Sequence, residues 1–425
     1  MLLFALLLLV VGGSQASHFS GTVVTYYLND TYSDGSLSVI FRAKFNIPNC
    51  NTTEYSYKGC ANEKVIVSNF VFENAGDTWC QSESITSCLL PDNSPFQFYF
   101  DSGNWIVNLN DIGSWRAVAD VELRIRSDTN KPNSSPQTTI FPGLRVPSNC
   151  SRNINLLTFD PDGDEIKCRY ASLSSDECDW PCTPAPVLTL SSICTLSFSS
   201  TSSSNQGIYA VQMVMEDFPR QTITLTHTDG SQIVRSTSDR IGTIPIQFAL
   251  IVDPAAPSCT EGAYLPRFIS PTPEHRAHFY IFVDKALEIN IRASATNSTI
   301  TGLLYSGPYN MIKTSSGLGH FSLSWTPSTS EAEQSHPICF VVQASFSSSV
   351  YQSELRCVIV TVRIPPKTYL TVVKLNISTT LPLKGNHDKL LKAMKDKLIK
   401  NGLPPNITLR LLSNRLAEGS ERVAP

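Results

Sequence analysis

The sequence predicts a mainly β protein, in which tandem antiparallel β-sandwich domains precede a small C-terminal β-α-β module. Three observations support this prediction. Short β-branched or aromatic runs, broken by Ser, Thr, Pro, Gly and Asn clusters, fill the first 365 residues. These runs recur over about 110 residues per unit, the spacing of a two-sheet sandwich. Helical spacing of apolar residues occurs near the end of the chain, at His387–Asn401.

The N-terminus predicts secretion. An apolar run from Leu2 to Val11 is followed by small residues up to Ser17, as in a signal peptide, which we place at residues 1–16. The run is shorter than the roughly 20 residues that cross a bilayer, and a core strand would lack the abrupt change to small polar residues. No later segment has the length of a membrane helix, and no lipid-anchor tail is evident. We therefore expect an extracellular chain without direct membrane insertion.

Cysteines and glycosylation signals agree with this location. The chain has 12 cysteines, an even number that predicts six disulfides in an oxidising compartment. Seven N-x-S/T sequons predict surface glycans. They lie at Asn29, Asn51, Asn133, Asn149, Asn297, Asn376 and Asn406.

Residues 17–130 are predicted to form a disulfide-bonded β domain. Ser33–Ser36 supplies a hairpin turn between its first two strands, and the polar segment Asp128–Gln137 is interpreted as a linker. The strands expected in this domain are Thr22–Leu28, Leu37–Phe45, Val65–Phe72, Phe96–Phe100 and Val118–Ile125.

Residues 138–254 and 257–365 are predicted to form two further β-sandwiches, separated by a proline-rich linker at 253–257. In the second, Cys339 and Cys357 lie on consecutive predicted strands, where an antiparallel pair places them within disulfide range. Two other groups of cysteines are expected to pair among themselves. The first group is Cys50, Cys60, Cys80 and Cys88, and the second is Cys150, Cys168, Cys178, Cys182, Cys194 and Cys259.

The C-terminal region changes character. Leu370–Ile377 and Asn406–Leu412 alternate like strands and flank the helix, with Gly402 as its left-handed cap. Residues 368–413 therefore predict a β-α-β module, and residues 414–425 form a polar tail. The lysine-rich face of the helix is interpreted as a solvated face and not as a membrane surface.

Two stretches resemble known extracellular domains. Leu157–Ile166, with Glu216-Asp217 downstream, is similar to cadherin-like domains, which place an Asp-Pro-Asp-Gly-Asp turn between early strands and an Asp after a late strand. Phe321–Pro327, with Ile338–Ala344 downstream, resembles Ig-like repeats. The linkers lack the Asp-x-Asn-Asp motif that bridges calcium between cadherin repeats.

The Asp-rich turn is the candidate metal site. Asp160, Asp162 and Asp164 alternate, and in the tight turn that Pro161 and Gly163 favour their carboxylates converge. A calcium ion with oxygen ligands would relieve their repulsion, and Asp217 is a candidate fourth ligand. A plain Asx-stabilised turn explains the same residues equally well. Calcium would be a structural ion here.

No catalytic motif is present: the sequence has no G-x-S-x-G, H-E-x-x-H, P-loop or G-x-G-x-x-G. A net charge of −3 without a charged block argues against nucleic acid or nucleotide partners. We expect a secreted binding, adhesion or matrix-type protein that recognises an extracellular protein or glycan. The alternative is a secreted hydrolase or carbohydrate-binding protein with its site in the N-terminal domain. An exposed patch of Trp79, Trp105 and Trp115 would favour binding, although tryptophan in a β-sandwich is more often core.

Overall fold

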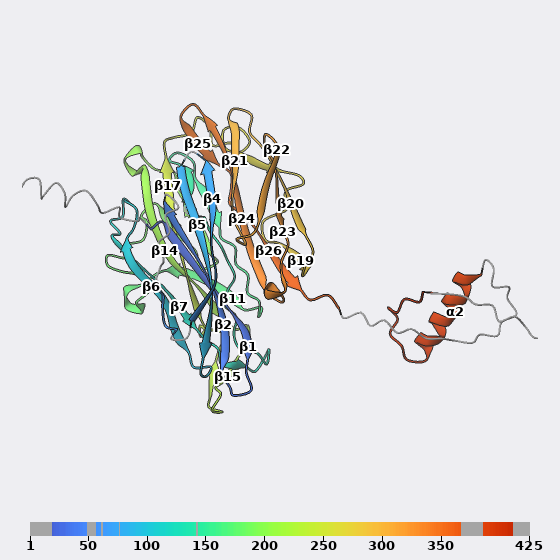
Figure 1. Ribbon diagram of the computed structural model, residues 1–425. Helices are drawn as coiled ribbons and strands as arrows, with labels where there is room; N and C mark the ends of the chain where they lie inside the picture. Colours follow the sequence, from blue (N-terminus) through green and yellow to red (C-terminus); the bar gives the residue numbers. More distant parts are fainter. Residues whose placement is uncertain are drawn as a thin grey trace, which may run out of the picture. The chain divides into compact units, whose positions relative to one another are not determined.

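The computed structural model describes residues 19–48, 57–60, 63–75, 77–141, 143–366 and 386–410. The chain divides into two units, residues 1–365 and 366–425 (Figure 1). The first unit is mainly β, with several antiparallel sheets, as the sequence predicts. The predicted signal peptide, polar tail and sequons at Asn51 and Asn376 lie outside the described residues.

The largest sheet has 11 strands, and its continuous path runs β3-β6-β7-β17-β1-β2-β5-β4. Strand β14 pairs with β17 and β11, and β9 runs parallel to β17. The predicted hairpin joins β1 and β2, with Gly35 at φ 88°. The strands are β1 (Gly21–Thr31), β2 (Leu37–Pro48), β3 (Tyr57–Lys58), β4 (Glu63–Ala75), β5 (Asp77–Leu90), β6 (Phe96–Asn104), β7 (Ser114–Val121), β9 (Gly143–Pro147), β11 (Glu165–Tyr170), β14 (Gly207–Phe218) and β17 (Thr243–Asp253).

Strand β17 determines how the first two predicted domains are joined. It pairs with β7 and β1 from the first predicted domain and with β14 and β9 from the second. Nearly all of its residues are buried, as a long apolar strand requires. Residues 128–137 therefore do not separate two sheets, which corrects the interpretation of this segment as an interdomain linker.

Two small sheets complete this region, and the described part of the chain has three short 3-10 turns. Arg152–Asn155 pairs antiparallel with Thr195–Phe198 in one of these sheets. One sheet comprises β10 (Arg152–Asn155), β13 (Thr195–Phe198) and β12 (Leu188–Leu190), and the other β16 (Gln232–Arg235), β15 (Ile223–Thr226) and β8 (Ile125–Arg126). The turns are η1 (Leu173–Ser175), η2 (Ser203–Asn205) and η3 (Thr329–Glu331).

The third predicted domain is a two-sheet sandwich. Its interior contains Trp325, Phe340 and Val360, all buried. Cys339 and Cys357 are directly opposite on β24 and β26, and the predicted disulfide between them is present. One sheet comprises β18 (Arg267–Ile269), β20 (Leu287–Ser294), β23 (His320–Trp325) and β22 (Ile312–Gly317). The other comprises β19 (Ala277–Phe282), β26 (Arg356–Arg363), β24 (Ser335–Phe346), β21 (Thr299–Ser306) and β25 (Ser349–Gln352).

The outer face of the second of these sheets packs against the 11-stranded sheet. Val341 and Ile359 belong to the same buried cluster as Val24. Polar contacts cross the same interface: Tyr27 Oη donates to the Ser335 carbonyl at 2.7 Å, and Lys44 Nζ donates to the Gly307 carbonyl at 2.6 Å. The three predicted β regions thus form one packed unit.

Five disulfides join ten cysteines, and the described part of the chain contains no free cysteine. Each of the five joins two cysteines of the same predicted group. Cys150–Cys259 links the segment before the third region to the second region. The side chains of Cys50 and Cys80 lie outside the described residues. The disulfides are Cys60–Cys88, Cys150–Cys259, Cys168–Cys194, Cys178–Cys182 and Cys339–Cys357.

The second unit contains helix α2 (His387–Lys400), at the position that the spacing predicts. Gly402 has φ 98° and ends it as expected. Residues 406–410 are not in a strand, so the described part of the strand expected at 406–412 is absent; its partner at 370–377 lies outside the described residues. Among the helices that the structure describes, none has both the length and the apolarity to span a membrane.

Candidate functional site

The Asp-Pro-Asp-Gly-Asp segment forms a tight turn that leads into β11. Asp160 Oδ1 accepts the backbone N–H groups of Asp162 at 2.8 Å and Asp164 at 3.1 Å. Gly163 has φ 86°, a conformation that favours glycine. These contacts are the Asx-type turn that the sequence suggested, and they draw the carboxylates of Asp160 and Asp164 toward the protein interior.

Strand β14 brings Asp217 to this turn. Asp217 is fully buried and lies opposite Ile166 of β11. Its Oδ2 accepts Nδ2 of Asn133 at 2.6 Å, and its Oδ1 accepts the Gly242 N–H at 2.8 Å. One carboxylate oxygen each from Asp160, Asp164 and Asp217 lies within 4.8 Å of the others. We call these three residues the acidic cluster.

Asp162 departs from the prediction. Its Oδ2 accepts the backbone N–H of Ser134 at 2.6 Å, and it is not a member of the acidic cluster. The side chain points toward a different loop because alternate residues of a tight turn do not share one face as they do in a strand. The structure therefore brings together three of the four predicted ligands.

Arg126 is a member of this candidate site that the sequence did not reveal. It lies on β8, is only 1% exposed, and donates to both carboxylate oxygens of Asp164, with Nη2 to Oδ1 at 2.7 Å. It also donates to Asp128 at 3.0 and 2.9 Å and to Asn133 Oδ1 at 2.6 Å. No local pattern indicates this role, since Asp164 is 38 residues further along the chain.

Burial and like charge dominate the electrostatics of this site. Burial, followed by repulsion from Asp217 and Asp164, raises the pKa of Asp160 well above its ordinary value. Burial also raises the pKa of Asp217, to about 7, and that of Asp162. Burial alone would lower the pKa of Arg126, but its hydrogen bonds to Asp164 and Asp128 raise it overall. One guanidinium therefore faces more carboxylates than it can neutralise.

The acidic cluster has the donor set of a hard cation site. Two oxygens bound to one calcium ion at 2.3–2.6 Å are at most about 5 Å apart, which the 4.8 Å limit satisfies. Asp160 Oδ2 is buried and has no hydrogen-bond partner among the described residues. The bonded oxygens of Asp164 and Asp217 each keep a second lone pair. A buried acceptor without a partner is unfavourable, so these residues fit a metal ion.

The sequon at Asn133 lies within this site. The Asn133 side chain is fully buried, and its Nδ2, the atom that a glycan would modify, donates to Asp217. The fold is therefore incompatible with a glycan on Asn133, which corrects that prediction. Asn149 as a whole is exposed, but its Nδ2, the atom that would carry a glycan, donates to the Ala256 carbonyl at 2.9 Å. Asn29, Asn297 and Asn406 are exposed.

Two of the three tryptophans considered as a surface patch lie in the core. Trp105 and Trp115 are buried around Phe19, and the Trp115 ring stacks on the Phe19 ring at 3.8 Å between centroids. The side chain of Trp79 lies outside the described residues. Among the tryptophans whose side chains are described, Trp180 is exposed, and no sequence pattern pointed to it.

No protein-family model matches this chain, and no curated protein matches it. Among solved structures, it is similar to human protocadherin-24 EC1-2, with 11% identity over 54% of this chain and 99% of that chain, at a TM-score of 0.17. It is also similar to the protocadherin GammaB4 extracellular domain, with 11% identity over 80% of this chain and 61% of that chain, at a TM-score of 0.19. It is similar as well to the eight N-terminal Ig domains of Down syndrome cell adhesion molecule, with 11% identity over 80% of this chain and 37% of that chain, at a TM-score of 0.16.

The resemblance to cadherin-like and Ig-like domains thus recurs among solved structures. At these TM-scores the resemblance carries no argument about function. The five disulfides are consistent with an extracellular protein.

Proposed function

We propose that this chain is a secreted glycoprotein that acts by binding, as an adhesion or matrix-type protein. The observation that carries the proposal is a rigid β unit in which every described cysteine is in a disulfide. Such a unit suits an oxidising compartment and presents its loops in fixed positions, where binding residues are most often found. An extracellular protein or glycan is the partner class.

A binding screen tests this function. The chain, expressed through the secretory pathway, is recovered from the medium, made multivalent and applied to panels of extracellular proteins and glycans. We expect saturable binding to a small set of partners. A Cys339→Ser/Cys357→Ser variant is the matched control, because it alters the folded scaffold without touching any exposed loop.

The same purified chain separates binding from catalysis. Turnover on a panel of glycosidase, esterase and peptidase substrates, in the absence of any saturable partner, would favour the secreted hydrolase instead. Retention of the expressed chain inside cells, with reduced cysteines, would contradict the extracellular location.

We also propose that the acidic cluster holds a structural calcium ion. Support comes from the three converging carboxylates, the partnerless Oδ2 of Asp160 and the raised pKa values of Asp160 and Asp217. The ion would tie the turn before β11 to the end of β14. The dependence of the thermal stability of the purified chain on calcium tests the proposal.

A further inference from the structure

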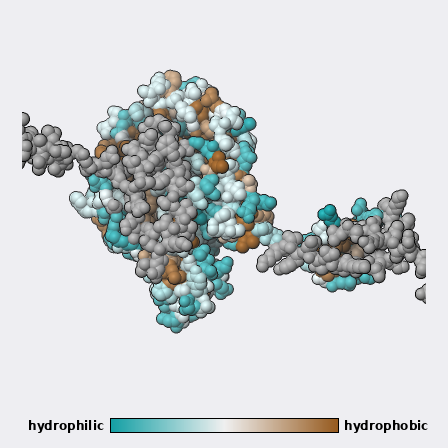
Figure 2. Space-filling model, in the orientation of Figure 1, coloured by the Kyte–Doolittle hydropathy of each residue, from teal (hydrophilic) through white to brown (hydrophobic). Residues whose placement is uncertain are grey.

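An open cleft of about 520 Å³ lies in the first unit, away from any residue of the acidic cluster. One wall is the segment 235–241, which joins β16 to β17, and the other is the start of β6 with the end of β7. Figure 2 shows mainly hydrophilic surface at the end of the unit that carries β15, the strand that pairs with β16. The volume is in the range of sites that bind small molecules or single groups of a larger ligand.

Hydrogen bonds and an ion pair hold the two walls in place. Asp239 Oδ2 accepts the backbone N–H of Ser236 at 2.8 Å and its hydroxyl at 2.7 Å, which closes a turn in the first wall. Arg240 Nη2 lies 3.1 Å from Oδ2 of Asp120 and so links this wall to β7. Because the walls are already ordered, a ligand would not have to bear the entropy cost of fixing them.

Three arginines line the cleft, and two of them have carboxylate partners. Arg124 donates to Glu122 through Nε at 2.8 Å and also through Nη2. Arg240 is paired with Asp120. Arg235 makes no hydrogen bond or ion pair with any residue that the structure describes, and its Nε is buried without a partner.

Arg235 is held against the wall of the cleft. It is half-buried, and its Nε is covered, so the side chain does not extend freely into water. Asp239 is the carboxylate whose charge it senses, but Asp239 is engaged in its own turn. The hydrogen bonds from Ser236, followed by the charge of Arg235, lower the pKa of Asp239. The Nη groups of Arg235 therefore remain available to a ligand.

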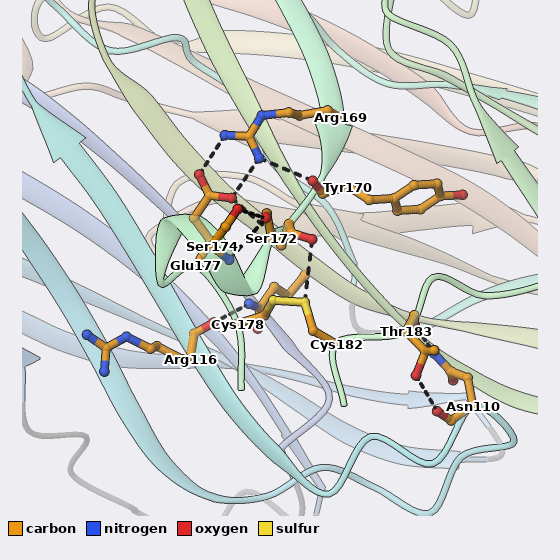
Figure 3. The surroundings of a disulfide bond; sticks show 12 residues. Asn110, Arg116, Arg169, Tyr170, Ser172, Ser174, Glu177, Cys178, Cys182 and Thr183 are labelled. Carbon is orange, nitrogen blue, oxygen red and sulfur yellow. Dashed lines mark hydrogen bonds and ion pairs between the residues drawn. A yellow bond between two sulfur atoms is a disulfide. The ribbon is translucent and has the colours of Figure 1, made fainter. Parts of the chain in front are cut away.

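Arg169 shows how a guanidinium is satisfied elsewhere in this unit (Figure 3). It donates to both carboxylate oxygens of Glu177, at 2.7 and 2.6 Å. Arg126 bonds both oxygens of Asp164 in the same way. The planar guanidinium matches two oxygens of a carboxylate or sulfate group. Within the described part of the chain Arg235 lacks this counterpart, which an oxyanion of a ligand would supply.

The other groups that line the cleft suit a sugar ring. Phe96 is half-buried, and an edge contact with the Phe41 ring, at 6.2 Å between centroids, holds it in place. Gln97 uses its Nε2 in a hydrogen bond within the protein, so its Oε1 is an acceptor for a hydroxyl. The Nη1 of Arg124 is a further donor, since Nε and Nη2 are the atoms bonded to Glu122. An apolar wall with a few placed polar groups is typical of sites that orient a ligand.

We propose that this cleft binds an extracellular glycan whose sugar rings carry a carboxylate or sulfate group. The Nη groups of Arg235 would donate to that oxyanion, and Phe96 would pack against the ring that carries it. Gln97 and Arg124 would bond its hydroxyls. An acidic peptide offers the same carboxylate but few hydroxyls for these remaining groups. This inference rests on the proposed binding function and names its surface and its partner class.

Isothermal titration of the full chain with defined oligosaccharides tests the inference. The probes are a heparin hexasaccharide, a hyaluronan hexasaccharide and the neutral hexamer of N-acetylglucosamine. We expect at least one anionic probe to bind at least tenfold more tightly than the neutral probe, and more tightly at low salt than at high salt. Binding of hyaluronan would show that a carboxylate suffices, whereas binding of heparin alone would identify sulfate as the group recognised.

Three variants locate the binding in the cleft. Arg235→Gln should weaken binding of the preferred anionic probe at least tenfold and keep the wild-type melting temperature, because Arg235 makes no hydrogen bond with the described residues. Arg235→Lys keeps the charge but loses the planar fork, so its affinity should be intermediate. Arg267→Gln is the matched control, because Arg267 is exposed and does not line the cleft, and it should leave the affinity unchanged.

Four results would overturn the inference. They are no binding of either anionic probe, equal affinity for the neutral probe, unchanged affinity in Arg235→Gln, and tighter binding of a hexaglutamate peptide than of both anionic probes. If the partner screen finds a protein or a neutral glycan that Arg235→Gln binds normally, the cleft fails as the binding surface while the binding function stands.

Discussion

The Asp160→Asn substitution should stabilise the protein when divalent ions are absent. It should also weaken the stabilisation that calcium gives. Asparagine keeps the Oδ1 acceptor for the N–H groups of Asp162 and Asp164, so the turn is preserved. The substitution removes one negative charge and the buried oxygen that lacks a partner. In EDTA, where the remaining carboxylates repel one another, Asp160→Asn should therefore be more stable than the wild type.

The magnitude follows from the burial of the cluster. At pH 8 without an ion, ionising Asp217 against a pKa of about 7 instead of 3.8 opposes folding by about 4 kcal/mol. A calcium concentration 100 times the dissociation constant stabilises the wild type by about 2.7 kcal/mol. Calcium should thus raise the wild-type melting temperature by several degrees and raise that of Asp160→Asn by much less, so the stability advantage of Asp160→Asn in EDTA should shrink in calcium.

The assay is thermal unfolding at pH 8 in EDTA and in millimolar calcium, with isothermal titration for affinity. Asp162→Asn is the matched control, because Asp162 belongs to the same turn but not to the acidic cluster, and it should keep most of the calcium response. Identical melting temperatures for the wild type in calcium and EDTA, with Asp160→Asn more stable in both, would show that protons and Arg126 alone neutralise the cluster.

Three further predictions concern the same unit. Burial, followed by the positive charges of Arg42 and Lys44, lowers the pKa of His336 well below 6.5. As the pH falls below 6.5, the unfolded chain therefore binds a proton at this histidine before the folded chain does, and the protein should lose stability. Denaturant titrations should show a smaller loss for His336→Gln. Removing the Cys339–Cys357 disulfide, whose separation is 18 residues, with Cys339→Ser/Cys357→Ser should cost about 3 kcal/mol of unfolding free energy in the same titrations. Glycopeptide mapping should find glycans on the exposed Asn29 and Asn297 and none on the buried Asn133.

Local pattern was enough to predict the β class and several strands. Alternating or continuous apolar runs such as Ile244–Val252 become buried strands because each must bury its backbone and side chains together. The helix at His387–Lys400 and its glycine cap follow from local spacing and backbone preference. The Cys339–Cys357 disulfide follows from two adjacent strands in register.

Strand β5 shows where local pattern fails. Its sequence is rich in serine, threonine and charged residues, so it was not predicted, yet Gln81 and Glu83 are buried. Their hydrogen-bond partners lie far along the chain: Ser306 Oγ donates to Gln81 Oε1 at 2.6 Å, and Arg42 Nη1 donates to Glu83 Oε1 at 3.4 Å. A polar residue can be buried when the tertiary structure provides its hydrogen-bond partners, and the neighbouring sequence does not reveal those partners.

The candidate site, too, was predicted from the sequence only in part. The sequence by itself determined that Asp160 and Asp164 share a turn, because Pro161, Gly163 and the Asx contacts are local. Only the tertiary structure decided that Asp217 and Arg126 meet them, that Asp162 turns away, and that Asn133 is buried instead of glycosylated. Charges and amides separated by tens of residues interact only once the sheets have packed, because burial is what makes their pairing necessary.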